Sequence, residues 1–266
     1  MLKSLYLPAL AVIIAFVGLA MTDSNAEYIC GDANSDGSLN VSDAIYIANY
    51  VFMGGPMPDP GCCGIACGGM VTDYDGNFYR TVLIGDQCWM MDNLKVTHYR
   101  NGDTIPNVTD AGEWHDFATG AFCEFNNDPV NVDTYGRLYN WYAVTDGRNI
   151  APEGWHVATL EEWQTLAMYL GGDAVAGGKL KVAGTAFWMS PNTGATNESG
   201  FTALPGGYRD GYGGFVATGT QARFWTSTTY GGADFGEYLY VVHDNAELLQ
   251  TWLYARFGLS IRCVKD

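Results

Sequence analysis

Residues 32–43 (DANSDGSLNVSD) constrain the local backbone more tightly than any other stretch of the chain. Oxygen-bearing groups recur at positions 1, 3, 5, 7, 9 and 12, and Gly37 takes position 6, where a calcium-binding loop turns sharply. Calcium is bound by six to eight oxygen atoms, so this spacing predicts a chain wrapped around one Ca²⁺ ion. The alternative is an acidic surface turn rich in Asn and Gly. Such a turn would not need an oxygen-bearing group at every ligand position of a calcium-binding loop. The predicted ligands, with Ser38 acting through its backbone carbonyl, are Asp32, Asn34, Asp36, Ser38, Asn40 and Asp43.

The residues after this loop predict a helix over 42–53. Its apolar positions fall on one face, and Gly54-Gly55-Pro56 ends it. Loop and helix together, residues 31–60, resemble one half-EF-hand repeat of the dockerin family. The resemblance implies Ca²⁺ binding and, for paired repeats, docking to a cohesin module. This chain carries a single repeat, and Val41 stands where the family usually has a hydroxyl residue. The resemblance therefore supports the calcium ligands more strongly than it supports a cohesin-like partner.

The first 26 residues have the pattern of a secretory signal peptide. Lys3 gives the positive start, residues 5–20 are the apolar segment, and Ser24-Asn25-Ala26 is a small-residue cleavage site. The apolar run is short for a membrane span, and no second one follows. The net charge of −16 argues against nucleic acid or an anionic membrane as a partner. We therefore expect an extracellular, secreted or surface-associated protein with no transmembrane segment in the mature chain.

All seven cysteines follow the predicted cleavage site, where an oxidising compartment would let most of them pair. The odd number leaves at least one cysteine without a partner. We favour a bridge from Cys30 to the cluster at residues 62–67, which would close the two ends of the calcium module. The sequence does not determine the pairing. The candidates for disulfides are Cys30, Cys62, Cys63, Cys67, Cys88 and Cys123.

A linker at residues 61–70, within a Pro- and Gly-rich stretch, separates the repeat at 27–60 from a larger domain at 71–266. Residues 71–94 alternate in the β pattern and are broken by two turns that contain Asp and Gly. An aromatic segment at 135–144 is predicted to lie in the core. Further strands are predicted at residues 224–228, 238–243, 251–257 and 259–264.

The clearest helix of the larger domain begins after Thr159. Thr159 and Glu162 form a capping box, the apolar face includes Trp163 and Leu166, and Gly171-Gly172 ends the helix. Glu161 and Glu162 favour the positive end of the helix dipole, so they are interpreted as helix-start residues and not as paired catalytic carboxylates.

The larger domain resembles the Fibrobacter succinogenes major paralogous domain over residues 71–266. The segments that carry the resemblance include Ile84-Gly85-Asp86-Gln87, Tyr135-Gly136-Arg137-Leu138-Tyr139-Asn140-Trp141-Tyr142, Gly154-Trp155-His156-Val157, Ser199-Gly200-Phe201 and Arg262-Cys263-Val264. The family is similar to the C-type-lectin-like and formylglycine-generating fold. The resemblance implies a loop-rich α+β domain with a small twisted antiparallel sheet and one main helix.

One departure from the family pattern bears on the disulfides. Ala151 stands where the family often has a cysteine. If that cysteine normally pairs with the one at Cys263, then Cys263 has no partner in this chain. The resemblance then favours a bridge between Cys88 and Cys123.

No catalytic motif is recognisable in the sequence, so we expect no enzyme activity. The sequence has no nucleophile elbow, phosphate-binding loop, HExxH motif or dinucleotide fingerprint. His156, between two apolar residues, is interpreted as a hydrogen-bonded structural residue. Formylglycine-generating enzymes need a reactive cysteine pair late in the chain, and only Cys263 is available there.

Binding is the remaining function, and aromatic residues would supply it. The chain has 17 Tyr, 12 Phe and 8 Trp, which can offer flat surfaces for sugar rings. Trp114 and Tyr212 are flanked by polar residues or glycine and are the predicted exposed ligand-binding residues. A second Ca²⁺ could bind around residues 126–128.

We therefore expect a non-catalytic, calcium-binding surface or adhesion protein whose larger domain binds a glycan or protein ligand. Alternatives are an accessory component of an extracellular polysaccharide-degrading complex, by cohesin docking or glycoside hydrolysis, and a structural subunit of a surface layer or fibre.

Overall fold

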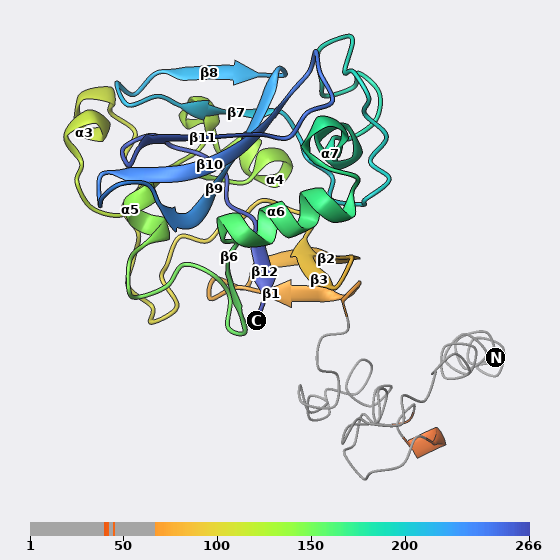
Figure 1. Cartoon of the computed structure of the whole chain (residues 1–266). Coiled ribbons are helices and arrows are strands. Elements are labelled where there is room, and N and C mark those ends of the chain that lie inside the picture. The colour runs from red at the N-terminus through yellow and green to blue at the C-terminus, as the bar shows by residue number, and fades with distance from the viewer. Residues whose placement is uncertain (1–39, 43–44, 46–66) are drawn as a thin grey trace, which may run out of the picture. The chain divides into compact units, whose positions relative to one another are not determined.

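The computed structural model describes residues 40–42, 45 and 67–266 (Figure 1). The chain divides into two units, Met1–Ala66 and Cys67–Asp266. In the first unit, Val41, Ser42 and Ile45 are helical, and the Asn40 side-chain oxygen accepts a hydrogen bond from the Ser42 backbone N–H at 2.8 Å. Ser42 and Ile45 fall within the helix predicted over 42–53, whereas Val41 precedes its predicted start. Outside the described residues lie the predicted signal peptide, Cys30, Cys62, Cys63 and the ligands Asp32, Asn34, Asp36, Ser38 and Asp43.

The second unit contains two five-stranded sheets. The first has the order β1-β2-β3-β12-β6 and is antiparallel throughout. Its strands are β1 (Met70–Thr72), β2 (Phe78–Ile84), β3 (Gln87–Met90), β6 (Trp155–Val157) and β12 (Cys263–Lys265). Gly85, with a φ of 62°, turns the chain between β2 and β3, so the tight turn predicted there is confirmed.

The second sheet has the order β11-β10-β9-β7-β8, and in it β7 and β9 pair in parallel. Its strands are β7 (Gly206–Arg209), β8 (Phe215–Thr218), β9 (Gln221–Thr229), β10 (Phe235–Val242) and β11 (Leu249–Tyr254). A short pair, β4 (Phe122–Cys123) with β5 (Leu138–Tyr139), stands apart from both sheets. Strand β11 lies at one edge of the second sheet.

Helix α6 (Leu160–Tyr169) confirms the helix predicted after Thr159. The Thr159 hydroxyl accepts from the Glu162 backbone N–H, and the Glu162 carboxylate accepts from the Thr159 backbone N–H, which completes the capping box. The side chains of Trp163 and Leu166 are buried, as the apolar face requires. The remaining helices are short: α3 (Ala111–Asp116), η1 (Phe125–Asn127), η2 (Pro129–Asn131), α4 (Val132–Tyr135), α5 (Trp141–Val144) and α7 (Asp173–Leu180).

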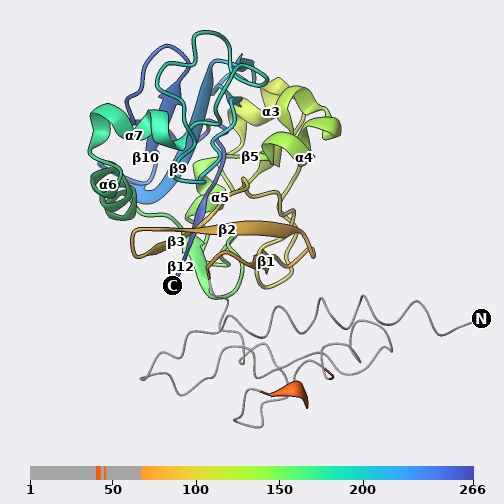
Figure 2. The same ribbon diagram turned by 90° about the vertical axis from the view of Figure 1, so that its right-hand side faces the viewer.

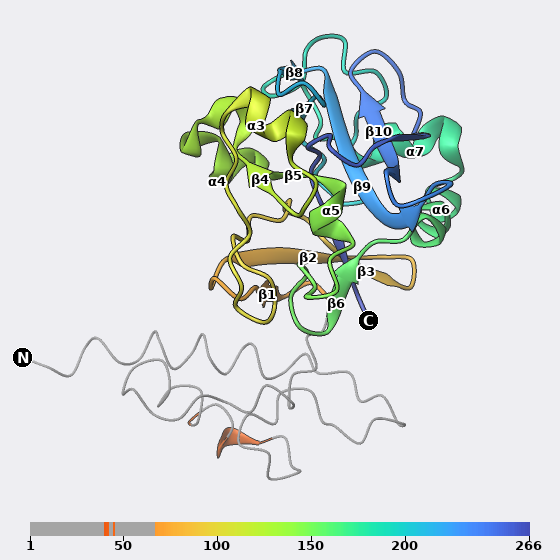
Figure 3. The same cartoon turned by 90° about the vertical axis from the view of Figure 1, so that its left-hand side faces the viewer.

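The main core lies where α6 packs between the two sheets. Trp163 of α6 contacts Trp89 of the first sheet and Phe224 of the second, with ring centroids 4.8 and 5.4 Å apart. Figures 2 and 3 view the domain from opposite sides and place α6 and α7 on one side of β9 and β10, with α3, α4, β4 and β5 on the other. No helix among the described residues is both long and apolar enough to cross a membrane.

The domain is a mixed helix and sheet fold that is mostly β, with more sheet than the sequence predicted. The predicted strand at 259–264 is wrong in extent, because only Cys263–Lys265 forms β12. Leu259 and Ser260 instead make single bridges to Tyr139 and Phe224. The backbone passes from one sheet to the other in this segment, so it cannot follow either sheet as a regular strand.

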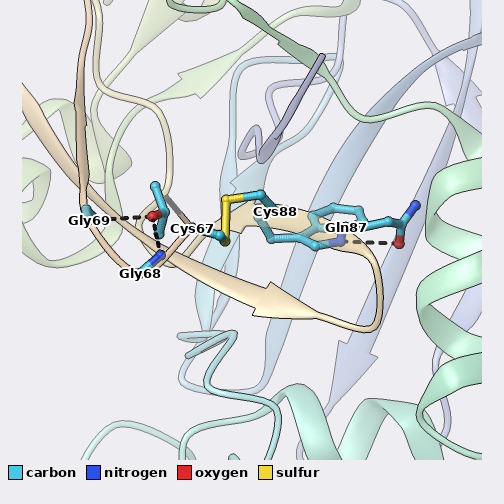
Figure 4. Close-up of a disulfide and its surroundings, with 7 residues drawn as sticks. Cys67, Gly68, Gly69, Gln87 and Cys88 are labelled. Atoms are coloured by element: carbon cyan, nitrogen blue, oxygen red, sulfur yellow. Dashed lines mark hydrogen bonds between the residues drawn. A yellow bond between two sulfur atoms is a disulfide. The ribbon is translucent and has the colours of Figure 1, made fainter. Parts of the chain in front are cut away.

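A disulfide between Cys67 and Cys88 ties the start of the domain to β3, with the two Cα atoms 5.5 Å apart (Figure 4). Hydrogen bonds from the Gly68 N–H to the Thr81 hydroxyl and from the Thr81 N–H to the Gly69 carbonyl, each 3.0 Å, hold the same segment against β2. A bridge between Cys67 and Cys30 is therefore not formed.

The bridge predicted between Cys88 and Cys123 is wrong, because Cys88 pairs with Cys67. Cys123 lies on β4 within a separate apolar cluster, where it packs with Val108 and Trp114. Cys123 and Cys263 are free and buried, and burial raises the pKa of the Cys123 thiol to about 12. Both thiols are consequently inert side chains of the core.

Candidate functional site

A tight turn presents Tyr212 to solvent between β7 and β8. The Asp210 carboxylate accepts hydrogen bonds from the backbone N–H groups of Tyr212 and Gly214, each at 2.9 Å. The Asp210 N–H also donates to the Gly214 carbonyl at 2.8 Å. Gly213 has a φ of 87°, and a Cβ there would lie 2.5 Å from the Cα of Ala111, so only glycine fits. With its backbone fixed in this way, the Tyr212 side chain is 80% exposed, as predicted.

Helix α3 supplies the opposite wall of the site. Asp110 caps it by accepting a hydrogen bond from the Glu113 N–H at 2.9 Å. Trp114 is only 1% exposed, so the prediction that it is an exposed ligand-binding residue is wrong. Its indole ring packs inward beneath the Arg209 guanidinium at 4.5 Å. The next residue, His115, is the α3 side chain that reaches the site.

Arg209 is a buried residue that joins the two walls. Its guanidinium donates to the backbone carbonyls of Thr109 at 2.9 Å and Gly213 at 3.1 Å. One of these carbonyls precedes α3 and the other lies in the Tyr212 turn. Arg209 therefore sets the spacing between His115 and Tyr212 without lining the site itself.

His115 and Tyr212 line a cleft of about 320 Å³. Their rings are nearly parallel, with an interplanar angle of 9° and centroids 5.3 Å apart. The six lining residues come from α3, from the β7–β8 turn and from the end of β11 with the residues after it. They are His115, Gly211, Tyr212, Tyr254, Arg256 and Phe257.

The hydrogen bonds of His115 determine its tautomer. Its Nδ1 lies 2.7 Å from the Gly211 carbonyl oxygen. Because a carbonyl only accepts, Nδ1 must carry the hydrogen. In the neutral ring, Nε2 is then an acceptor, and the Arg256 Nη1 lies 3.4 Å from Nε2 and equally far from Nδ1. His115 therefore joins the Tyr212 turn to Arg256.

Gly211 makes room for Arg256. A Cβ on Gly211 would lie 3.0 Å from the Cγ and Cδ of Arg256 and from one edge carbon of Phe257. At this distance the side chains of Arg256 and Phe257 would have to move to make room for a Cβ. The missing side chain at this position lets the arginine stem lie along the turn.

Exposed aromatic rings continue from the cleft along β11. Trp252 and Tyr254 are two residues apart on this edge strand, so both project from the same face. Phe235 of β10 packs against both, with centroids 5.3 and 4.8 Å away. Tyr230 stacks on Trp252 at 5.2 Å and 6°. We call Tyr230, Phe235, Trp252 and Tyr254 the β11 aromatic strip.

The other sequence-predicted groups have local structural roles. Asn127 donates to the Thr109 carbonyl at 2.9 Å, and Asp128 accepts from the Val130 N–H at 3.1 Å, so the segment proposed for a second Ca²⁺ shapes a turn. In the described part of the chain, no three His, Cys, Asp or Glu side chains are grouped as metal ligands. His156 bonds to the carboxylates of Glu162 and Asp266, at 2.7 and 2.6 Å.

The family model of the Fibrobacter succinogenes major domain matches residues 82–265. The chain belongs to this family. The matched range runs from within β2 to β12 and contains every residue of the cleft in this major domain. Neither the curated proteins nor the solved structures gave a match to the chain.

Sequence reasoning identified one of the cleft residues of the major domain, Tyr212. It missed His115, Tyr254 and Arg256, which come together only through folding. One signal was present in the predicted strand at 251–257, where Trp252 and Tyr254 alternate with smaller residues. An edge strand with two large aromatics on one face is a sign of a binding surface.

Proposed function

We propose that the major domain is a non-catalytic carbohydrate-binding module whose ligand occupies the cleft and the β11 aromatic strip. The observation that carries this proposal is the exposure of Tyr212, whose ring lines the cleft and is stacked on His115. Aromatic faces offer area to the apolar C–H face of a sugar ring, while the polar edge of the cleft supplies hydrogen bonds.

The β11 aromatic strip supports a ligand longer than one sugar unit. Tyr254 belongs both to the cleft and to the strip, and its ring centroid lies 6.4 Å from that of Trp252, so the strip begins at the cleft. Large aromatic rings exposed side by side do not help a protein to stay soluble, and such a patch commonly marks a binding surface. The net charge of −16 is enough to keep this chain soluble. A linear oligosaccharide could place neighbouring units on successive rings of this surface.

For the whole protein, we propose secretion and calcium binding in addition to glycan binding. Residues 1–26 would direct secretion, and the dockerin-like repeat would bind one Ca²⁺ and form a rigid stem before the major domain. The resemblance stated above supports a C-type-lectin-like fold for that domain. The result would be an extracellular or surface-bound protein that presents the cleft to glycans.

A glycan array probed with the full mature chain in the presence of Ca²⁺ tests the proposal. Wild-type protein should bind a defined set of oligosaccharides, and Tyr212→Ala should lose that binding. Tyr74→Ala is the matched control, because Tyr74 is 58% exposed, lies near a histidine ring at 5.7 Å and is outside the cleft. Equal binding by Tyr212→Ala and wild type would refute the assignment of the cleft, and cleavage of the glycans would refute a non-catalytic role.

A further inference from the structure

We infer that the cleft recognises a sugar that carries a carboxylate, such as a hexuronic acid unit of an acidic polysaccharide. This inference rests on the proposed function and names the chemical class of its ligand. Arg256 is the one lining residue with a permanent charge. Among residues 67–266, none of the ion pairs within 4.0 Å involves Arg256.

The other arginines of the domain are held by carboxylates, by backbone carbonyls or by an aromatic ring. Three of them, Arg80, Arg137 and Arg148, pair with carboxylates. Another three, Arg100, Arg209 and Arg262, donate to backbone carbonyls inside the domain. Arg223 lies on the ring of Tyr208 at 3.6 Å. The chain has 29 acidic and 13 basic side chains, so carboxylates are abundant. Within residues 67–266, Arg256 nevertheless has no carboxylate within ion-pair distance.

The immediate contacts of Arg256 leave most of its donors available. Nη1 lies 3.4 Å from the His115 ring, and the guanidinium carbon lies 5.8 Å from the centre of the Tyr254 ring. Asp234 and Arg256 both influence the pKa of Tyr142, but they do not form an ion pair. A guanidinium has five N–H donors in a planar arrangement that matches a carboxylate.

The surroundings of Arg256 suit a uronic acid. The arginine lines the same cleft as two exposed rings, Tyr212 and Tyr254. A sugar ring stacked on either tyrosine would hold its carboxylate at the ring edge, where the guanidinium can donate two hydrogen bonds. His115, anchored to the Gly211 carbonyl, orients Arg256 for this contact.

The overall acidity of the chain does not exclude an acidic ligand. At physiological ionic strength the Debye length is about 8 Å, so distant carboxylates are largely screened. The contact with Arg256 is short and partly shielded by aromatic rings, so it is screened less. Discrimination between acidic and neutral sugars should therefore arise at this one residue.

The test compares polygalacturonate and alginate with the same two polymers after their carboxyl groups have been reduced to alcohols. Binding of the full mature chain is measured by isothermal titration at 0.15 M NaCl with Ca²⁺ held constant. Wild-type protein should bind at least one native polymer on the order of tenfold more tightly than its reduced form. Arg256→Gln should lose that preference and bind both forms alike. Arg80→Gln, which makes the same charge change away from the cleft, should retain it.

The outcomes separate this inference from the proposed function. Equal, Tyr212-dependent binding of native and reduced polymers would refute the acidic ligand and leave glycan binding intact. A preference that persists in Arg256→Gln would refute the role of Arg256. If wild-type protein bound neither form of either polymer, the acidic ligand would be refuted, while binding of neutral glycans on the array would still decide the proposed function. Thermal melting followed by tryptophan fluorescence checks that each variant is folded.

Discussion

Replacement of His156 by glutamine should destabilise the major domain in a pH-dependent way. His156 lies on β6 and bonds through Nε2 to Glu162 of α6 and through Nδ1 to Asp266. These bonds connect the first sheet to the start of the main helix. The hydrogen bond to Glu162 is the largest cause that raises the pKa of His156, to about 9, and the bond to Asp266 adds to it against the opposing effect of burial.

The raised pKa fixes the sign and the window of the effect. The contribution of His156 is fully present below its unfolded pKa of about 6.5 and is lost as the pH rises through about 9. A shift of this size corresponds to about 3 kcal/mol before screening. The His156 side chain is 33% exposed and that of Asp266 57%, so solvent screening reduces the expected contribution to about 1–2 kcal/mol.

Glu162 sets the acidic limit of the same window. Burial opposes its ionisation, but the hydrogen bonds from His156 and Thr159 outweigh burial and lower the Glu162 pKa. Its contribution is present above the unfolded pKa and is lost as the pH falls through the lower folded value. The interaction should therefore stabilise the domain most at mildly acidic pH.

Thermal unfolding followed by tryptophan fluorescence measures this prediction for the major domain alone, because all 8 tryptophans lie between residues 89 and 252. At pH 6, His156→Gln should lower the Tm by about 2–8 °C relative to wild type. At pH 9.5, the difference should nearly vanish. A difference of the same size at both pH values, or none at pH 6, would refute the electrostatic argument.

Two further predictions concern the cysteines and the calcium loop. Cys67→Ala with Cys88→Ala should destabilise the major domain by about 3 kcal/mol, because the bridge closes a loop with a sequence separation of 21; an unchanged urea midpoint would contradict this. Chelation of Ca²⁺ should melt the repeat at 27–60 and leave the tryptophan transition in place, since the ion would bind only the folded loop. In far-UV circular dichroism, Asp32→Ala or Asp36→Ala should each reproduce the effect of the chelator. A wild-type spectrum that does not change when the chelator is added would argue against the calcium assignment.

Local patterns in the sequence were sufficient to predict those elements whose structure depends on residues close together in the chain. The capping box at Thr159 and Glu162 defines the start of α6 without reference to the rest of the chain. The same holds for the β2–β3 hairpin, whose turn at Gly85 needs a positive φ. These elements were predicted with their correct type and nearly correct bounds.

The site could not be predicted because long-range contacts determine it. Trp114 has polar neighbours in sequence, yet Arg209, from a distant strand, covers its ring and places it in the core. His115 becomes a cleft residue for the same reason. Cys88 pairs with Cys67 because hydrogen bonds to Thr81 bring residues 68 and 69 beside β2.

The central claim is that a glycan binds in the cleft at Tyr212, and amide chemical-shift mapping tests it most directly. The labelled mature chain is titrated with the oligosaccharide that binds best on the array. The account predicts that the largest shifts occur at residues 210–214, at His115 and at residues 252–257. Largest shifts around Tyr74 and His98, or no shifts with a glycan that the protein retains, would contradict it.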